Sequence, residues 1–163
     1  MIKILVSACL LGCRVRYDGS DAAVRSTILQ EWRAEGRIIP FCPEVAAGMS
    51  IPREPAEIIG GEGGDVLVGE AIVREAGGRE VTGIYLDGAR RALDLARAEG
   101  VKVAVMKDGS PSCGRGFIYD GSFTGVKKRG RGVTVAILER AGVRVFSEAE
   151  IEKAAEWMRQ SAR

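Results

Sequence analysis

Short runs of aliphatic and β-branched residues recur along the chain, and each run ends where small, polar or cysteine residues begin. The first run covers residues 2–6 (IKILV), and three more cover 37–41 (RIIPF), 101–106 (VKVAVM) and 143–146 (VRVF). Apolar runs of this length, bounded by turn residues, are typical of strands buried in a sheet. We therefore predict a strand at each of these four positions.

Segments with apolar residues at helical spacing separate the predicted strands. They indicate helices over about 20–36, 82–99, 133–141 and 147–160, with Ser20 and Thr82 as expected caps of the first two. Ser147 and Glu150 have the spacing of a capping box at the start of the last helix. Strands that alternate with helices are typical of an α/β fold, so we expect a three-layer structure with a mostly parallel sheet of about four strands.

The segments between these elements are rich in glycine and proline. Three prolines predict irregular structure over residues 43–57, and a stretch of that length in a compact domain is usually functional. The other expected features are a flexible glycine turn at 60–64, a small hairpin of 66–74 with 79–81, a hairpin-like segment at 117–124 and a basic, glycine-rich loop at 125–132.

The composition limits the kinds of site that this chain can hold. Its 163 residues carry a net charge of +2 and are 46% hydrophobic, which favours a single globular domain over 1–163. No histidine is present, so a Ser-His-Asp or Cys-His nucleophile and a histidine-ligated metal are excluded. The chain enters its first strand without a signal peptide and has no run long enough to span a membrane, which favours the cytoplasm. Cysteines in that compartment are expected to be thiols or metal ligands rather than disulfides.

Cysteines follow three of the predicted strands. Cys9, Cys42 and Cys113 come just after the runs at 2–6, 37–41 and 101–106, respectively. They could be unrelated buried thiols, but ligands of open parallel sheets bind outside the carboxyl ends of the strands, where these cysteines can converge. We therefore predict a shared metal site. Three thiolates suit a cubane iron–sulfur cluster with one open iron that acts as a Lewis acid, whereas a structural zinc prefers four ligands.

Other residues near these cysteines could carry the chemistry. Cys13 is too widely spaced from Cys9 for the two to form a CxxC metal-binding pair, so we expect Cys13 to be a free thiol. Glu44 is the only general acid or base candidate near the predicted site, because the chain has no histidine. Ser110 and Ser112 either form a turn around the intervening proline or donate hydrogen bonds to a substrate.

A basic run precedes the predicted helix at 133–141. Lys127, Lys128, Arg129 and Arg131 lie among glycines, and Arg115 follows the third cysteine closely enough to extend the patch. Such a run is most often a solvated loop. Its position before a helix start also suits a phosphate, because free backbone amides, the helix dipole and cations would act together on an anion.

Seven segments together resemble the thiouracil desulfidase family. They are SACLLG at 7–12, RYDG at 16–19, CPE at 42–44, PREPAEI at 52–58, SPSCG at 110–114, IYDGSFTG at 118–125 and GVT at 132–134. The resemblance covers nearly the whole chain. It implies a Rossmann-like fold and an oxygen-sensitive 4Fe-4S cluster held by three cysteines, which match Cys9, Cys42 and Cys113.

The resemblance also implies a reaction without net redox change. Thiocarbonyl sulfur of a thiolated uracil binds the open iron, water replaces sulfur at carbon, and hydrogen sulfide leaves. Glu44 matches the catalytic glutamate of the family. A serine of the SPSCG loop is implicated as well, and we favour Ser110 over Ser112.

The substrate and two alternative functions remain open at this stage. The basic run favours a thiolated uridine monophosphate over the free base, whereas the small net charge makes a tRNA substrate less favoured. The first alternative is a sulfur-carrier or redox protein whose cluster never binds substrate. The second is a zinc-stapled binding domain without catalysis.

Overall fold

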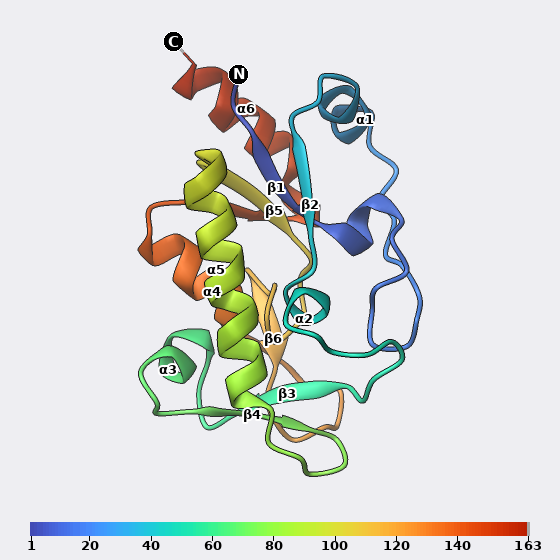
Figure 1. Cartoon of the computed structure of the whole chain (residues 1–163), viewed down its shortest axis with the longest axis vertical. Coiled ribbons are helices and arrows are strands. Elements are labelled where there is room, and N and C mark those ends of the chain that lie inside the picture. The colour runs from blue at the N-terminus through green and yellow to red at the C-terminus, as the bar shows by residue number, and fades with distance from the viewer. Residues whose placement is uncertain (163) are drawn as a thin grey trace.

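Four parallel strands form the central sheet of the computed structural model, which describes residues 1–162 (Figure 1). The strands are β1 (Ile4–Ser7), β2 (Ile38–Phe41), β5 (Val103–Met106) and β8 (Arg144–Ser147). They are ordered β2-β1-β5-β8, and every neighbouring pair is parallel. Each strand forms at one of the apolar runs in the sequence, so the prediction of a parallel α/β sheet is confirmed.

Helices cover both faces of this sheet, as alternation along the strands requires. Ile4 and Val6 of β1 pack against α1 (Thr27–Ala34) and α6 (Ile151–Ser161). Leu5, between them, points to the opposite face, where α4 (Thr82–Glu99) and α5 (Val133–Arg140) lie. The result is the predicted three-layer arrangement. Among residues 1–162, no helix is long and apolar enough to cross a membrane.

The first helix is shorter than predicted. It begins at Thr27, and its cap is Ser26, whose hydroxyl accepts a hydrogen bond from the amide of Leu29 at 3.2 Å. Residues before it run alongside the 3₁₀ turn η1 (Ala8–Leu11): the amides of Ala22 and Val24 donate to carbonyls of that turn. These amides are therefore unavailable for helical hydrogen bonds, and the expected cap at Ser20 is wrong.

The later helices match the sequence more closely. Helix α4 has the predicted bounds, with Gly100 in the left-handed conformation at its end. Its N-cap is Val81 rather than Thr82, whose hydroxyl instead accepts from the amide of Val73 at 3.0 Å. The capping box of Ser147 and Glu150 is present, and it closes a 3₁₀ turn, η2 (Glu148–Glu150), directly before α6.

Two small antiparallel pairs lie beyond the carboxyl ends of the sheet strands (Figure 1). Strand β3 (Ala56–Ile59) pairs with β4 (Ile72–Glu75), and β6 (Phe117–Tyr119) pairs with β7 (Lys127–Arg129). The basic run predicted as a loop is thus partly an edge strand. Charged side chains suit such an edge because they discourage further pairing.

The segment between β2 and β4 is more regular than its prolines suggested. Helix α2 (Pro43–Ala46) begins directly after Cys42 with proline at its first position, where no amide is needed. Helix α3 (Gly63–Leu67) begins inside the expected glycine turn. The predicted first strand at 66–74 is wrong, because residues 66 and 67 end α3 and the strand covers only Ile72–Glu75; the hairpin around residues 77 and 78 is reduced to an isolated bridge between Arg74 and Glu80.

Helices α2 and α4 are in direct contact through a glycine. A Cβ added to Gly88 of α4 would lie 2.5 Å from the carbonyl oxygen of Pro43 in α2. Glycine therefore sets how closely these helices approach. Since Glu44 is the next residue after Pro43, this contact also sets the position of the glutamate.

We expect Gly88→Ala to destabilise the fold by about 1–3 kcal/mol, the usual cost of overpacking, since backbone must move to admit the methyl group. Gly83→Ala on the same helix is the matched control. Nothing lies within 4 Å of a Cβ at Gly83, so alanine there should be neutral or stabilise by up to about 1 kcal/mol through helix propensity. Urea unfolding of both variants checks this, and equal midpoints would contradict the proposed close contact.

Candidate active site

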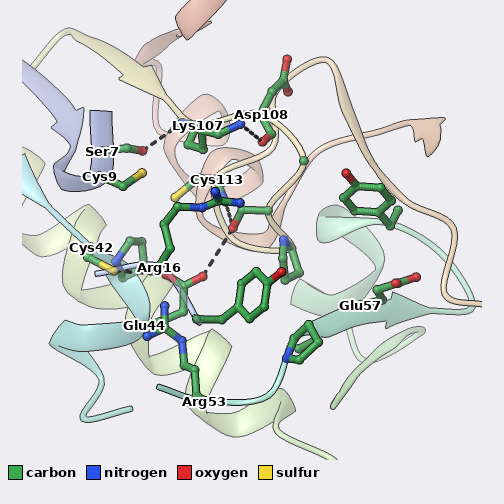
Figure 2. A pocket seen from close by; sticks show the side chains of 18 of the residues that line it. Ser7, Cys9, Arg16, Cys42, Glu44, Arg53, Glu57, Lys107, Asp108 and Cys113 are labelled. Atoms are coloured by element: carbon green, nitrogen blue, oxygen red, sulfur yellow. Dashed lines mark hydrogen bonds between the residues drawn. The ribbon is translucent and has the colours of Figure 1, made fainter. Parts of the chain in front are cut away.

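Three cysteines converge on one cavity of about 580 Å³ at the carboxyl edge of the sheet (Figure 2). Cys9 lies in η1 after β1, Cys42 directly follows β2, and Cys113 lies in the loop after β5. All three line the cavity. Cys13 is exposed and lies outside that lining. The structure therefore brings together the thiols that the sequence singled out and separates Cys13 from them.

Burial keeps these thiols protonated in the protein without a bound metal. It raises the pKa of Cys9 to about 11 and that of Cys42 to about 12, with the carboxylate of Glu44 adding to the shift at Cys42. Burial holds the pKa of Cys113 well above its usual value, and Glu44 again contributes. Thiolate is the form that binds metal, so binding here must displace protons from the thiols.

The donor set of this cavity suits an iron–sulfur cluster. Among residues 1–162, no three histidine, cysteine, aspartate or glutamate side chains are close enough to hold one metal ion. A zinc ion binds each thiolate at about 2.3 Å, so its ligands crowd around one point. An iron–sulfur cubane presents a separate iron to each thiolate. Three thiols around a shared cavity are therefore a suitable donor set for such a cluster.

Glu44 is a carboxylate in direct contact with one of these thiols. It is 9% exposed, and its Oε1 accepts a hydrogen bond of 2.5 Å from the hydroxyl of Ser112. Its Oε2 accepts from the thiol of Cys42 at 3.4 Å. Helix α2 sets this arrangement, because Cys42 is its N-cap and Glu44 lies in its first turn. A buried carboxylate with these two partners can take up and release protons beside the thiols.

The loop between β5 and β6 carries Cys113 and is called the cysteine loop below. Its two serines, Ser110 and Ser112, occupy different places. Ser112 is fully buried and is not among the lining residues, whereas Ser110 lines the cavity. Their hydroxyls are 2.9 Å apart. Ser112 donates its proton to Oε1 of Glu44 and can therefore accept from Ser110, whose hydroxyl also lies 3.4 Å from the same carboxylate oxygen. The three side chains thus form a chain of hydrogen bonds that runs from the cavity wall to the carboxylate.

A second set of contacts holds the cysteine loop, and the sequence reasoning missed it. Oδ1 of Asp108 accepts from the amides of Arg115, Gly116 and Phe117 at 2.8–3.2 Å. The carboxylate of Glu148 accepts from the amide of Asp108 at 2.7 Å. The only signal in the sequence was an aspartate directly before glycine at the end of a strand, which by itself indicates no more than a turn.

The start of α5 is closed to an anion, contrary to the expectation from sequence. The amide of Val133 donates to the carbonyl of Pro111 at 2.8 Å, and the amide of Thr134 donates to that of Ser112 at 2.9 Å. A Cβ on Gly132 would lie 2.5 Å from the Ser112 carbonyl, so only glycine fits there. The helix therefore binds the cysteine loop with the amides that a phosphate would have needed.

The predicted phosphate cations do not gather at one point. Arg115 donates to the carbonyl of Val145 and contacts Glu150, Lys128 donates to the carbonyl of Gly61, and Arg131 pairs with Glu139. Arg129 is exposed. Lys127 alone of the five lines the cavity, and its ammonium lies 4.6 Å from the centre of the Phe117 ring.

Cations from other segments line the cavity instead. These are Arg16, Arg53 and Lys107, and the sequence reasoning did not single them out. Arg53 donates to the carbonyl of Val15 at 2.8 Å, so it holds the segment that carries Arg16. Aromatic residues also line the cavity, among them Tyr85, whose pKa is raised by burial and by the Glu44 carboxylate.

Comparison with known proteins identifies the family of this chain. The model of the 2-thiouracil desulfurase family matches residues 4–150. YbbK of Bacillus subtilis strain 168, an uncharacterized protein, is 49% identical over 148 residues, which are 91% of this chain and 97% of YbbK. A solved structure of the 4Fe-4S-dependent thiouracil desulfidase TudS has a TM-score of 0.90 and 44% identity, covering 98% of this chain and 99% of that one. The chain belongs to the 2-thiouracil desulfurase family, as its sequence motifs predicted.

Proposed function

We propose that this protein is a desulfidase that converts the thiocarbonyl of a thiolated uracil to a carbonyl. Water supplies the oxygen and two protons, and sulfur leaves as hydrogen sulfide, so atoms balance without an electron donor. The observation that carries the proposal is the convergence of three thiols and a buried glutamate on one cavity. Anaerobic assay of the reconstituted protein with 2-thiouracil and 4-thiouracil, without reductant, tests it.

Cys9, Cys42 and Cys113 are the residues that hold the 4Fe-4S cluster in this proposal. When bound, the cluster supplies an iron without a protein ligand, a Lewis acid for the thiocarbonyl sulfur. Iron and sulfide analysis of anaerobically purified protein separates this function from the zinc-stapled alternative. Turnover without an electron donor separates it from a redox or carrier protein.

Glu44 is proposed to move the protons of the reaction. Once Cys42 loses its proton to bind metal, its thiol no longer donates to Oε2 of Glu44. That oxygen is then available to accept a proton from the attacking water and to return it to the departing sulfur. Oε1 stays bonded to Ser112, which fixes the orientation of the carboxylate.

The two serines are proposed to have separate roles. Ser110 lines the cavity and is therefore the hydroxyl that reaches the substrate. Ser112 is fully buried and acts through Glu44. This division agrees with the preference for Ser110 over Ser112 that the resemblance suggested.

We also propose that a thiolated uridine monophosphate is a better substrate than the free base. Lys127 supports this, because it is the one member of the basic run that lines the cavity, and Arg16 and Arg53 line it as well. A tRNA substrate is less favoured, and the cytoplasm is the location we infer.

The cluster ligands can be tested by substitution. Cys9→Ser, Cys42→Ser and Cys113→Ser should each abolish the broad visible absorbance of the cluster in the reconstituted protein. Cys13→Ser should retain it. In the metal-free protein, iodoacetamide should modify exposed Cys13 first and Cys113, which is less exposed than Cys9, last. Mass spectrometry of the alkylated peptides measures this order. Retention of the absorbance in any one of the three variants would refute the assignment.

Glu44→Gln should retain the cluster and lose about 10²–10⁴-fold in kcat, the usual cost of removing a general acid or base. Glu70→Gln, at an exposed position, is the matched control and should have normal kcat. Steady-state turnover of 4-thiouracil measures both.

The same turnover measurement tests the roles of the two serines. Ser110→Ala should lower kcat more than Ser112→Ala does, because only Ser110 lines the cavity. Near-normal kcat in Glu44→Gln would remove the carboxylate from the mechanism. The reverse order of the two serine variants would exchange their roles.

Lys127→Ala should lower the preference for nucleotide over base about 10-fold, a typical effect of losing one hydrogen bond to a charged group. The quantity measured is kcat/KM for 4-thiouridine monophosphate divided by that for 4-thiouracil. Arg129→Ala, two residues away and exposed, is the control and should leave the ratio unchanged. A free base preferred by the unmodified protein would rule out the phosphate contact.

A further inference from the structure

One residue in the wall of the cavity has an unusual backbone conformation. Among residues 1–162, Phe123 is the only residue other than glycine with positive φ, at 58°. Side chains with a Cβ disfavour this left-handed region. Phe123 lies in the turn between β6 and β7, and it lines the cavity. Something outside the turn must therefore stabilise this conformation.

Glu57 of β3 supplies that stabilisation. Its Oε1 accepts hydrogen bonds from the amides of both Gly121 and Phe123, at 2.9 and 3.2 Å. The turn also lies directly on β3, since a Cβ on Gly121 would be 2.7 Å from the carbonyl oxygen of Ile58. A single carboxylate oxygen thus binds the amides of Gly121 and Phe123, which are two residues apart in the turn. These hydrogen bonds fix the backbone at Phe123 and therefore the direction of its phenyl ring.

This part of the wall is across the cavity from the thiols. Figure 2 shows Glu57 on the opposite side of the cavity from Cys42 and Glu44. In a 4-thiolated pyrimidine, the reacting carbon C4 and the nitrogen N1 are at opposite ends of the ring. When C4 faces the thiols, the group on N1 extends away from them, toward the side where Phe123 lies. In a nucleotide, that group begins with the ribose.

Resting on the proposed function, we propose that Phe123 is a specificity-determining residue whose ring packs against the ribose of a thiolated nucleotide. Glu57 is the positioning residue that holds it there. The free base has no group on N1, so the contact discriminates between nucleotide and base without touching the reacting atoms. Lys127, the first residue of the strand that follows the same turn, also lines the cavity and is the cation proposed for the phosphate.

Binding of the sulfur-free products tests the proposal without turnover. Anaerobic calorimetry of the reconstituted protein compares uridine monophosphate with uracil. Phe123→Ala should weaken uridine monophosphate binding about 10-fold, the order of magnitude for one lost aromatic contact, and leave uracil binding within about 2-fold. Phe123→Tyr should retain both affinities. Val126→Ala, an exposed position in the same turn, is the matched control and should change neither.

The role of Glu57 is tested by the same affinities. Glu57→Ala should weaken the nucleotide as Phe123→Ala does, whereas Glu57→Gln should retain binding because its amide oxygen can still accept both hydrogen bonds. The double variant Glu57→Ala, Phe123→Ala should be no weaker than Phe123→Ala alone. A further loss in the double variant would show that Glu57 contacts the ligand itself, which overturns the positioning role.

Failure of the ribose contact and failure of the proposed desulfidase function give different results. Unchanged nucleotide affinity in Phe123→Ala, or a protein that does not bind uridine monophosphate, overturns the ribose contact even when 4-thiouracil is turned over. Absence of desulfuration by the loaded protein refutes the desulfidase function, whatever the affinities are. Circular dichroism of each variant establishes that the fold is intact.

Discussion

The hydrogen bond of 2.5 Å between Ser112 and Glu44 is the interaction on which the site depends. It joins residues 68 positions apart, one in the loop after β5 and the other in the helix after β2. A carboxylate with so little exposure is stable only when its oxygens have partners. The bond therefore fixes the glutamate, and it also fixes how the loop of Cys113 lies relative to Cys42.

The rest of the structure makes that bond possible from both sides. On the glutamate side, Gly88 lets α4 approach the backbone of Pro43. On the serine side, the first amides of α5 donate to the carbonyls of Pro111 and Ser112. A helix start that could have bound a phosphate is used instead to anchor the loop, because a buried loop must find partners for its own carbonyl groups.

The wall opposite the thiols is built in the same way, by one segment that fixes another. Strand β3 supplies Glu57 to the turn after β6, just as α5 supplies amides to the cysteine loop. The sheet edge thus provides the thiols, and the two antiparallel pairs provide the surface that faces them. In the proposed function, chemistry and discrimination between substrates therefore reside on different elements.

The sequence by itself determined the parallel sheet, the edge on which the cysteines meet and the candidate role of Glu44. These depend on local signals: apolar runs with a cysteine after each, glycine stops and a capping box. Tertiary structure decided the rest, because it depends on partners distant in the sequence. The amides of Ala22 and Val24 are taken by η1, so a predicted helix starts late, and the basic run pairs with β6 instead of cradling an anion. Only packing placed Ser110 on the cavity wall and Ser112 behind it, since the two serines are nearly equivalent along the chain.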